Sequence, residues 1–147
     1  MLLSQTAEYA LRAMAWLATA AGRDPVRAVD LSRATGIPAH YLSKVLRRLV
    51  LAELLESQKG QGGGFSLARA PAEIALSEVL AAVDAFPAQG RCAFGWGKCD
   101  ASDPCPLHDS WSHLNDRIRD WAAGTTLEEI ASSAPRGPRF AAHIEPT

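Results

Sequence analysis

The sequence predicts a mainly α-helical fold that contains one small β-hairpin. Two helical stretches meet at Gly36, and two short extended stretches then flank a glycine-rich segment at residues 60–64. Two helices joined by a glycine-containing turn are typical of a helix-turn-helix, and a hairpin directly after them gives the element order of a winged helix-turn-helix. A heptad pattern at residues 107–121 adds a long helix to this fold.

The composition indicates a globular protein of about one domain. The chain has 147 residues, of which 48% are hydrophobic and 21% charged, so it can bury a substantial core. No apolar run approaches the roughly 20 residues of a membrane span, and the N-terminus lacks a signal-peptide pattern, so we expect a cytoplasmic protein without a membrane partner. Residues 1–70 carry nine Lys/Arg against five Asp/Glu, whereas residues 71–147 carry six against eleven. The first part of the chain can therefore approach a polyanion.

The first helix is predicted between Ser4 and Gly22. Apolar residues recur at intervals of three and four from Ala7 to Ala21, Ser4 or Thr6 can cap the start, and Gly22 can end the helix. Glu8 lies in the first turn, where a carboxylate complements the helix dipole. This explanation and a functional role for Glu8 both stay open.

The two helices of the helix-turn-helix follow. A short helix at residues 29–35 closes at Gly36, and Pro38 opens the next helix. The second helix has a predicted buried stripe made of Leu42, Val45, Leu46 and Leu49. Its opposite face carries His40, Ser43, Lys44 and Arg47. Lys and Arg suit guanine edges or phosphates, and Ser and His form adaptable hydrogen bonds, so this face fits a DNA major groove. Taken alone, a solvated helix face explains the pattern more simply.

The predicted hairpin favours DNA binding over a plain solvated face. Residues 54–59 and 65–68 read as strands, and the glycine-rich tip between them allows the backbone to approach phosphates or the minor groove, with Lys59 adding charge. A nucleotide phosphate loop does not fit, because the glycines are not followed by Lys-Ser/Thr and lead into a strand. A hairpin without a ligand is the alternative. The candidate DNA-binding residues are His40, Tyr41, Ser43, Lys44, Arg47, Lys59, Gly60, Gln61 and Gly62.

A short connecting helix near residues 74–83 leads into the cysteine loop, residues 86–108. All three cysteines, Cys92, Cys99 and Cys105, lie in this loop, and His108 follows three positions after the last. Thiolates and a neutral imidazole suit zinc, copper(I) or an iron-sulfur cluster. The intervals of six, five and two residues match neither the usual paired zinc spacing nor the common ferredoxin runs. Three ordinary buried cysteines are the alternative, and a disulfide would leave one thiol over.

Pro106 opens the clearest helix in the chain. Its heptad seam consists of Leu107, Trp111, Leu114, Ile118 and Trp121. Such a seam either packs on its own domain or pairs with a second copy, as two-fold DNA readers require, and we expect a homodimer. The segment Thr126-Leu-Glu-Glu129 is a capping-box start for a last short helix.

Residues 1 to about 133 resemble the iron-sulfur-cluster-binding winged-helix transcriptional regulators typified by IscR and NsrR. These are bacterial dimeric regulators that sense cluster supply, nitric oxide or redox state. The matching stretches are Glu8-Tyr-Ala-Leu-Arg, Gly36-Ile-Pro-Ala-His-Tyr41-Leu, Lys59-Gly-Gln-Gly-Gly-Gly-Phe65, Leu76-Ser-Glu-Val-Leu-Ala-Ala-Val-Asp84 and the cysteine loop ending Cys105-Pro-Leu-His108 before Trp111.

The resemblance implies a set of cluster ligands. Cys92, Cys99 and Cys105 match the three cluster thiolates of the family, and His108 matches the fourth ligand of IscR-like members. Glu8 stands where NsrR-like members place an acidic ligand from the partner subunit, so it is the alternative fourth ligand. The histidine favours a 2Fe-2S cluster, with 4Fe-4S as the alternative.

The chain also departs from the family pattern. The first cysteine interval is six residues where many members have five, Ser43 replaces an acid of IscR-like proteins, and Lys59 replaces a frequent arginine.

The expected protein is a homodimeric repressor, not an enzyme, that binds a palindromic double-stranded DNA operator in the bacterial nucleoid and takes no small-molecule substrate. The predicted units are a DNA-binding domain at residues 1–70, the connecting helix, cysteine loop and dimerisation helix at 71–134, and a disordered tail at 135–147. The alternative function is a zinc-stabilised Cys3His nucleic-acid-binding module without a sensor role. A thiol redox enzyme fits less well, because the chain has no Cys-x-x-Cys pair.

Overall fold

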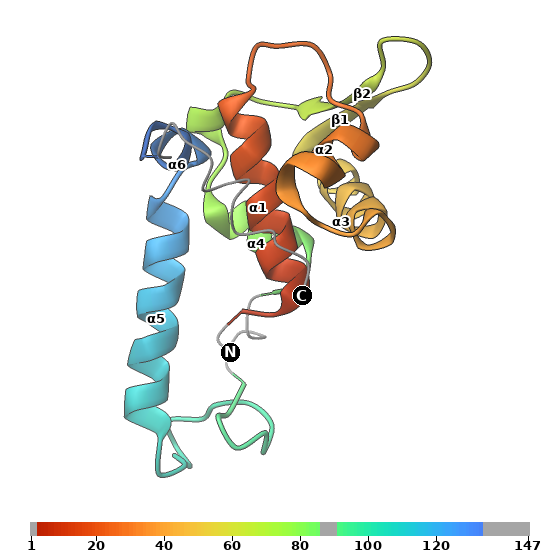
Figure 1. Ribbon diagram of the computed structural model, residues 1–147. Helices are drawn as coiled ribbons and strands as arrows, with labels where there is room; N and C mark the ends of the chain where they lie inside the picture. Colours follow the sequence, from red (N-terminus) through yellow and green to blue (C-terminus); the bar gives the residue numbers. More distant parts are fainter. Residues whose placement is uncertain (1–2, 86–90, 134–147) are drawn as a thin grey trace.

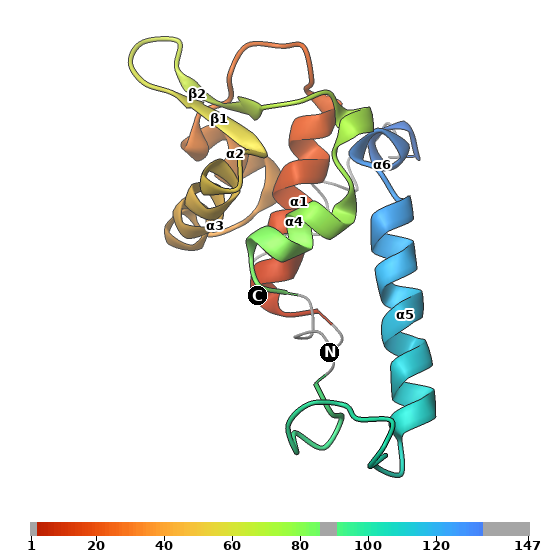
Figure 2. The same ribbon diagram turned by 180° about the vertical axis from the view of Figure 1, so that it is seen from behind.

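The computed structural model describes residues 3–85 and 91–133, and it confirms a mainly helical fold with one two-stranded antiparallel hairpin (Figures 1 and 2). The predicted tail at 135–147 and the start of the cysteine loop at 86–90 lie outside the described residues. The elements in chain order are α1 (Gln5–Thr19), α2 (Ala28–Thr35), α3 (Ala39–Leu51), β1 (Leu55–Gln58), β2 (Gly64–Leu67), the 3-10 helix η1 (Pro71–Glu73), α4 (Leu76–Ala82), α5 (His108–Gly124) and α6 (Leu127–Ser133).

Helices α2 and α3 form the predicted helix-turn-helix. Gly36 ends α2 in the left-handed conformation, with φ of 65°, and its N–H donates to the Ser32 carbonyl oxygen at 2.8 Å. A residue without a Cβ adopts this conformation at little cost, which explains the sharp turn. The predicted stripe of α3 is buried as a whole and consists of Leu42, Val45, Leu46 and Leu49.

The wing is the β1–β2 hairpin, in register from Leu55 opposite Leu67 to Gln58 opposite Gly64. Val26, in the loop before α2, pairs with Phe65 through two backbone hydrogen bonds of 2.9 and 2.8 Å. Gly64 makes this approach feasible, since a Cβ built there would lie 2.5 Å from the backbone of Val26. The wing is thus attached to the loop before α2 as well as to α3.

The core surrounds α1, which lies between the helix-turn-helix and α6 in both views, while α4 crosses α1 and contacts it (Figures 1 and 2). Its buried face is rich in alanine, with Ala7, Ala10 and Ala13 fully inaccessible, and small side chains allow neighbouring helices to come close. Residues on both sides of position 70 share this cluster, among them Leu31 and Leu127. The boundary at residue 70 stays a prediction.

Helix α4 is shorter than the connecting helix expected from the sequence. Ile74 is buried but precedes α4 in an extended segment, where its carbonyl accepts from the N–H of Leu127 at 3.0 Å. Glu78 caps α4, since its carboxylate accepts from the N–H of Ala75 at 3.0 Å and from the Arg69 guanidinium at 2.6 Å. Burial alone would raise the pKa of Glu78, but these hydrogen bonds and the charge of Arg69 lower it below its ordinary value.

Helix α5 runs alongside the body of the molecule from α6 to the cysteine loop (Figures 1 and 2). Of the described residues of α5, Ala122 alone is buried. The heptad residues Leu107, Leu114 and Trp121 are 46%, 44% and 48% exposed, whereas Trp111 and Ile118 are partly covered. The seam is therefore incompletely covered by its own chain.

Candidate functional site

The described part of the cysteine loop begins with a tight turn around Cys92. The N–H of Cys92 donates to the Gly97 carbonyl at 2.9 Å, and the N–H of Gly95 donates to the Cys92 carbonyl at 3.0 Å. Gly95 and Gly97 have φ of 74° and 104°, a region that disfavours other residues. Arg91 and Lys98 pair across the base of this turn. Two glycines thus close the chain around the first cysteine.

The four predicted ligands line one cavity of about 370 Å³. They are Cys92, Cys99, Cys105 and His108. All three cysteines lie in the described ranges and are free thiols. The Cys99 Sγ lies 3.0 Å from the His108 Nδ1, and the thiols of Cys92 and Cys105 lie close enough to shift each other's pKa, so the donors form two neighbouring pairs. No three His, Cys, Asp or Glu side chains in the described parts of the chain are close enough together to hold one metal ion.

The surroundings of the cavity shift the pKa values of two of its thiols in opposite directions. The backbone N–H of Phe94 is the main cause that lowers the pKa of Cys92, with help from the Cys105 thiol and the N–H groups of Trp96 and Gly95. Burial is the main cause that raises the pKa of Cys105. Since thiolates bind metals, Cys92 is held closer to its ligand form than Cys105.

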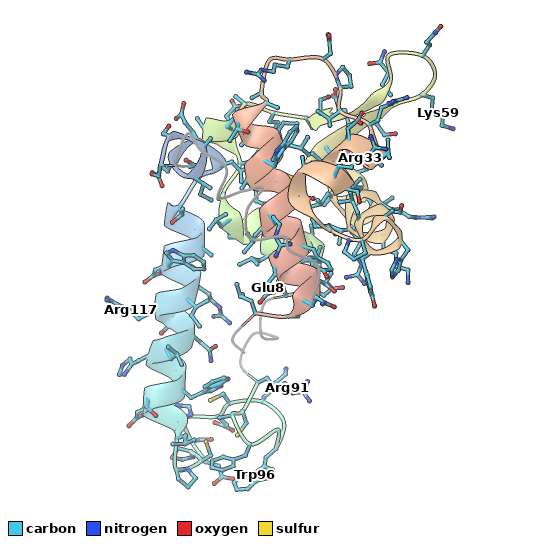
Figure 3. The ribbon with its side chains drawn as sticks, in the orientation of Figure 1. Glu8, Arg33, Lys59, Arg91, Trp96 and Arg117 are labelled. Atoms are coloured by element: carbon cyan, nitrogen blue, oxygen red, sulfur yellow. The ribbon has the colours of Figure 1, made fainter. Side chains whose placement is uncertain are left out.

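An aromatic pair at the rim was not anticipated from the sequence. The rings of Phe94 and Trp96 stack with centroids 4.7 Å apart, and Trp96 is 72% exposed although it lines the cavity. Figure 3 shows Trp96 and Arg91 on the loop, at the opposite end of the molecule from Lys59 in the wing. The pattern Phe-Gly-Trp beside the first cysteine was the available signal, because a glycine between two aromatic residues lets both rings turn to one side.

Glu8, the alternative ligand, does not line this cavity. It lies half-exposed near the start of α1, above the cysteine loop in the view of Figure 3, and its N–H donates to the Ser4 carbonyl at 3.0 Å. The side-chain oxygen of Ser4 accepts from the N–H of Ala7 at 3.2 Å and caps α1. The role predicted for Glu8 concerns the cavity of a partner subunit and stays a prediction.

The candidate DNA-binding residues lie at the surface. His40, Ser43, Lys44 and Arg47 are exposed on α3, and residues 59–62 are exposed at the wing tip, on the same side of the molecule as α3 in both views (Figures 1 and 2). The Tyr41 and His40 rings are in contact at an interplanar angle of 42°, with centroids 4.2 Å apart. The Ser43 hydroxyl donates to the Ala39 carbonyl at 2.9 Å, which leaves it less free to read a base. Their contacts with DNA stay a prediction.

Arg48 has a role that the sequence did not reveal. Its guanidinium reaches from α3 to the end of α4, where it donates to the Val83 carbonyl at 3.1 Å and lies 3.8 Å from the Asp84 carboxylate. Asp84 has φ of 53°, a left-handed conformation that turns the chain out of α4 toward the cysteine loop. This Arg48 contact joins α3 to the segment that enters the loop.

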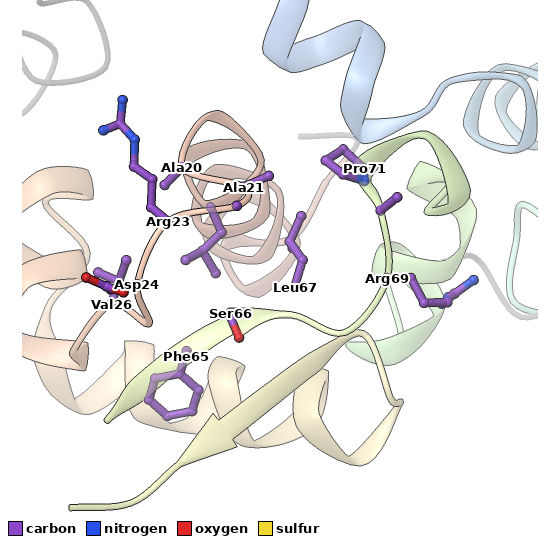
Figure 4. Close-up of a pocket in the computed structure, with 13 residues that line it drawn as sticks. Ala20, Ala21, Arg23, Asp24, Val26, Phe65, Ser66, Leu67, Arg69 and Pro71 are labelled. Carbon is purple, nitrogen blue, oxygen red and sulfur yellow. The ribbon is translucent and has the colours of Figure 1, made fainter. Parts of the chain in front are cut away.

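A second cavity of about 470 Å³ lies between the end of α1 and β2 (Figure 4). Its walls are mainly apolar, and the side chains of Arg23 and Arg69 extend away from it. Its polar lining residues are Arg23, Asp24, Ser66 and Arg69.

Known proteins match almost the whole chain. A family model named Rrf2 and described as iron-dependent transcriptional regulator matches residues 3–133. The chain is 39% identical over 135 residues to a protein named as an HTH-type transcriptional regulator in Mycobacterium tuberculosis (strain H37Rv), with 91% of this chain and 83% of that protein covered. It is 35% identical over 133 residues to IscR of Escherichia coli O139:H28, with 90% and 82% covered. These relatives are named as transcriptional regulators, which are not enzymes.

Two solved structures have the same fold. CymR, the global cysteine regulator of B. subtilis, superposes with a TM-score of 0.73 at 24% identity over 88% of this chain and 95% of that one. IscR of T. potens gives a TM-score of 0.73 at 24% identity over 89% of this chain and 86% of that one.

None of the described helices is both long and apolar enough to cross a membrane. The chain belongs to the Rrf2 family of iron-dependent transcriptional regulators and has its DNA-binding winged helix-turn-helix fold.

Proposed function

We propose that the chain is a homodimeric repressor whose affinity for a palindromic operator is controlled by an iron-sulfur cluster bound in the cysteine loop. The observation that carries the proposal is the cavity that gathers Cys92, Cys99, Cys105 and His108. The description of the family as iron-dependent and the 35% identity to IscR support it. The protein would act in the bacterial cytoplasm, at the nucleoid.

The donor set fits such a cluster. Three thiols and one imidazole are soft ligands, and they stand in two pairs, Cys92 with Cys105 and Cys99 with His108. A 2Fe-2S centre takes two protein ligands on each of its two irons, and two donor pairs suit that pattern. We therefore favour 2Fe-2S over 4Fe-4S. A single tetrahedral zinc needs all four donors around one point, and the two pairs suit that less well. When bound, the cluster supplies a redox-active centre that can respond to cluster supply, nitric oxide or redox state.

Backbone groups and a helix of the chain position the proposed ligands and stabilise one thiolate. The N–H groups of Phe94, Gly95 and Trp96 stabilise the thiolate of Cys92. His108 is the first residue of α5, so its imidazole is held by a regular helix while the three thiols come from the loop. Glu8 of a partner subunit is the alternative to His108 as fourth ligand.

DNA would be read by α3 and the wing. Lys44 and Arg47 are exposed on α3 and would enter the major groove, while the backbone of Gly60 and Gly62 would let the wing tip approach phosphates. In a dimer paired through Leu107, Trp111, Leu114, Ile118 and Trp121, two such faces would bind half-sites about one DNA turn apart. The exposed apolar side chains of α5 support this pairing.

A physical connection between the two sites runs through α4. The cysteine loop leaves the end of α4, and the Arg48 contact ties that end to the recognition helix. A change in the order of the loop would alter the position of α4, and thereby of α3 relative to its partner. Switching of DNA affinity would follow from this movement.

Iron, acid-labile sulfide and zinc per chain, measured on protein purified without air, test the proposal. Iron and sulfide in equal amounts, at about two or about four per chain, are expected, and operator affinity should change when they are removed. Zinc at about one per chain without sulfide would instead indicate the Cys3His nucleic-acid-binding module. The cluster proposal would then fail, while membership of the DNA-binding family would stand.

A further inference from the structure

Trp111 makes a contact inside its own chain that the heptad pattern does not predict. The pattern assigns Trp111 to the seam of α5, but its indole N–H donates to the carbonyl oxygen of Arg91 at 2.9 Å. Arg91 is the residue directly before Cys92. A side chain at the end of the first turn of α5 is therefore hydrogen-bonded to the backbone at the start of the described cysteine loop.

The acceptor belongs to the base of the turn around Cys92. Arg91 pairs with Lys98, the neighbour of Cys99, and the N–H of Cys92 is bonded to Gly97. A hydrogen bond that fixes Arg91 thus fixes the approach of the chain to two of the three cysteines. The Phe94–Trp96 stack packs only within this turn, and Gly95 and Gly97 add no side chains, so the contact from Trp111 is what ties the base of the turn to α5.

The same helix also carries His108. Residues 108 and 111 are three positions apart in α5, a spacing that places them on one face of a helix. His108 lies 3.0 Å from Cys99 while Trp111 holds Arg91, so α5 contacts the loop at both of its cysteine-bearing edges.

We propose that Trp111 is a positioning residue that holds the turn around Cys92 against α5, the helix that carries His108, and so keeps the two donor pairs of the cavity together. The inference rests on the proposed function for the identity of the bound group. The hydrogen bond from Trp111 to Arg91 can be tested without that group.

The hydrogen bond is tested first in metal-free wild-type protein. The indole N–H of Trp111 should exchange with solvent more slowly than those of Trp96 and Trp121, which are 72% and 48% exposed. The expected protection is about fivefold, because a net hydrogen bond contributes about 1 kcal/mol. NMR of protein labelled at its tryptophans measures the exchange, and a Trp111→Phe spectrum assigns the signal. Equal exchange at the three indoles would overturn the inference.

The consequence for Cys92 is tested by alkylation of the metal-free protein. Trp111→Phe keeps the ring and removes the donor, so Cys92 should react about fivefold faster, as loss of that bond implies, while Cys105 changes less. Trp16→Phe, in α1 and outside both the cavity lining and the α5 seam, is the matched control and should leave both rates unchanged. Circular dichroism and the melting temperature show whether each variant is folded. An unchanged rate at Cys92 in folded Trp111→Phe would contradict the positioning role.

Reconstitution separates this inference from the proposed function. With iron and sulfide, Trp111→Phe should give a visible circular dichroism spectrum different from that of the wild type and lose iron faster to a chelator, whereas Trp16→Phe should match the wild type. A wild-type spectrum and rate in Trp111→Phe would overturn the inference and leave the cluster proposal standing. Wild-type protein that takes up no iron and sulfide would defeat the cluster proposal, while the exchange and alkylation results would still decide the role of Trp111.

Discussion

Gly64 lies where the wing meets the loop before α2, and we predict that Gly64→Ala damages the wing. A Cβ there would meet the Val26 carbonyl at 2.5 Å, and the residue also has φ of 148°. The pairing of Val26 with Phe65 should break, which would lower the melting temperature and weaken operator binding in a gel-shift titration. Gly62→Ala is the matched control, because the space around it is open and only its φ of 75° opposes the change, at about 1–2 kcal/mol. Equal effects of the two variants would contradict this reading.

The fourth ligand can be identified by two single substitutions. His108→Ala should lower the iron and sulfide retained after anaerobic purification and shift the visible absorption, because His108 lines the cavity beside Cys99. Glu8→Ala should leave both unchanged, since Glu8 does not line the cavity of its own chain. The opposite result would transfer the role to the partner's carboxylate.

The residue types of the site could be predicted, but their pairing could not. Three cysteines and a histidine in one loop indicate a soft metal site from composition and ligand chemistry alone. That Cys92 faces Cys105 while Cys99 faces His108 depends on the left-handed turns at Gly95 and Gly97 and on the hydrogen bond from Trp111 to Arg91. These contacts join residues that carry no common sequence pattern.

Two adjacent arginines of α3 should have different functions. Arg47 lies on the exposed face, so Arg47→Ala should weaken operator binding and reduce the slope of log affinity against log salt concentration by about one. Arg48→Ala should leave that slope unchanged and instead lower the free energy of unfolding by about 1 kcal/mol, because the hydrogen bond to Val83 is lost. Salt-dependent binding titrations and chemical denaturation measure the two effects. A lower salt slope in Arg48→Ala would place that residue on DNA as well.

The cap of α4 predicts a pH-dependent contribution to stability. The folded-state pKa of Glu78 is lowered, so its contribution is fully present above the ordinary value of 4.5 and is lost as the pH falls through the lower folded-state pKa. Glu78→Gln should therefore destabilise the protein at pH 7 by less than about 1 kcal/mol, because the pair with Arg69 is partly exposed and screened by solvent. The difference from the wild type should shrink as the pH falls below 4.5. Denaturation at the two pH values measures it, and a difference independent of pH would contradict the assignment.

Capping residues and local spacing in the sequence predicted most helices and strands. They failed where contacts with distant parts of the chain determine the local structure. Ser4, Gly36 and the Thr126–Glu129 capping box mark helix ends because each acts on neighbouring backbone, and all three have these roles in the structure. Ile74 was assigned to a helix by its spacing. It lies instead in an extended segment that pairs with the chain between α5 and α6, a contact from more than fifty residues away.

At the scale of the whole molecule, α5 should determine the oligomeric state. Leu114→Glu places a charge among the exposed apolar side chains of the seam and should convert a dimer to a monomer in sedimentation equilibrium, with loss of affinity for a palindromic site but not for single half-sites. Arg117→Glu, a charge change on the same helix outside the heptad positions, is the control. A dimer that persists in Leu114→Glu would move the interface elsewhere.

The weak coverage of α5 by its own chain also bears on how much protein a cell contains. If two copies pair through this helix, part of the free energy of folding comes from association, so the melting temperature rises with protein concentration. At low protein concentration a larger fraction of the chains would then be unfolded, and the protein would be degraded more readily than at high concentration. The abundance of the regulator would become a second input to its control, alongside any signal received in the cysteine loop.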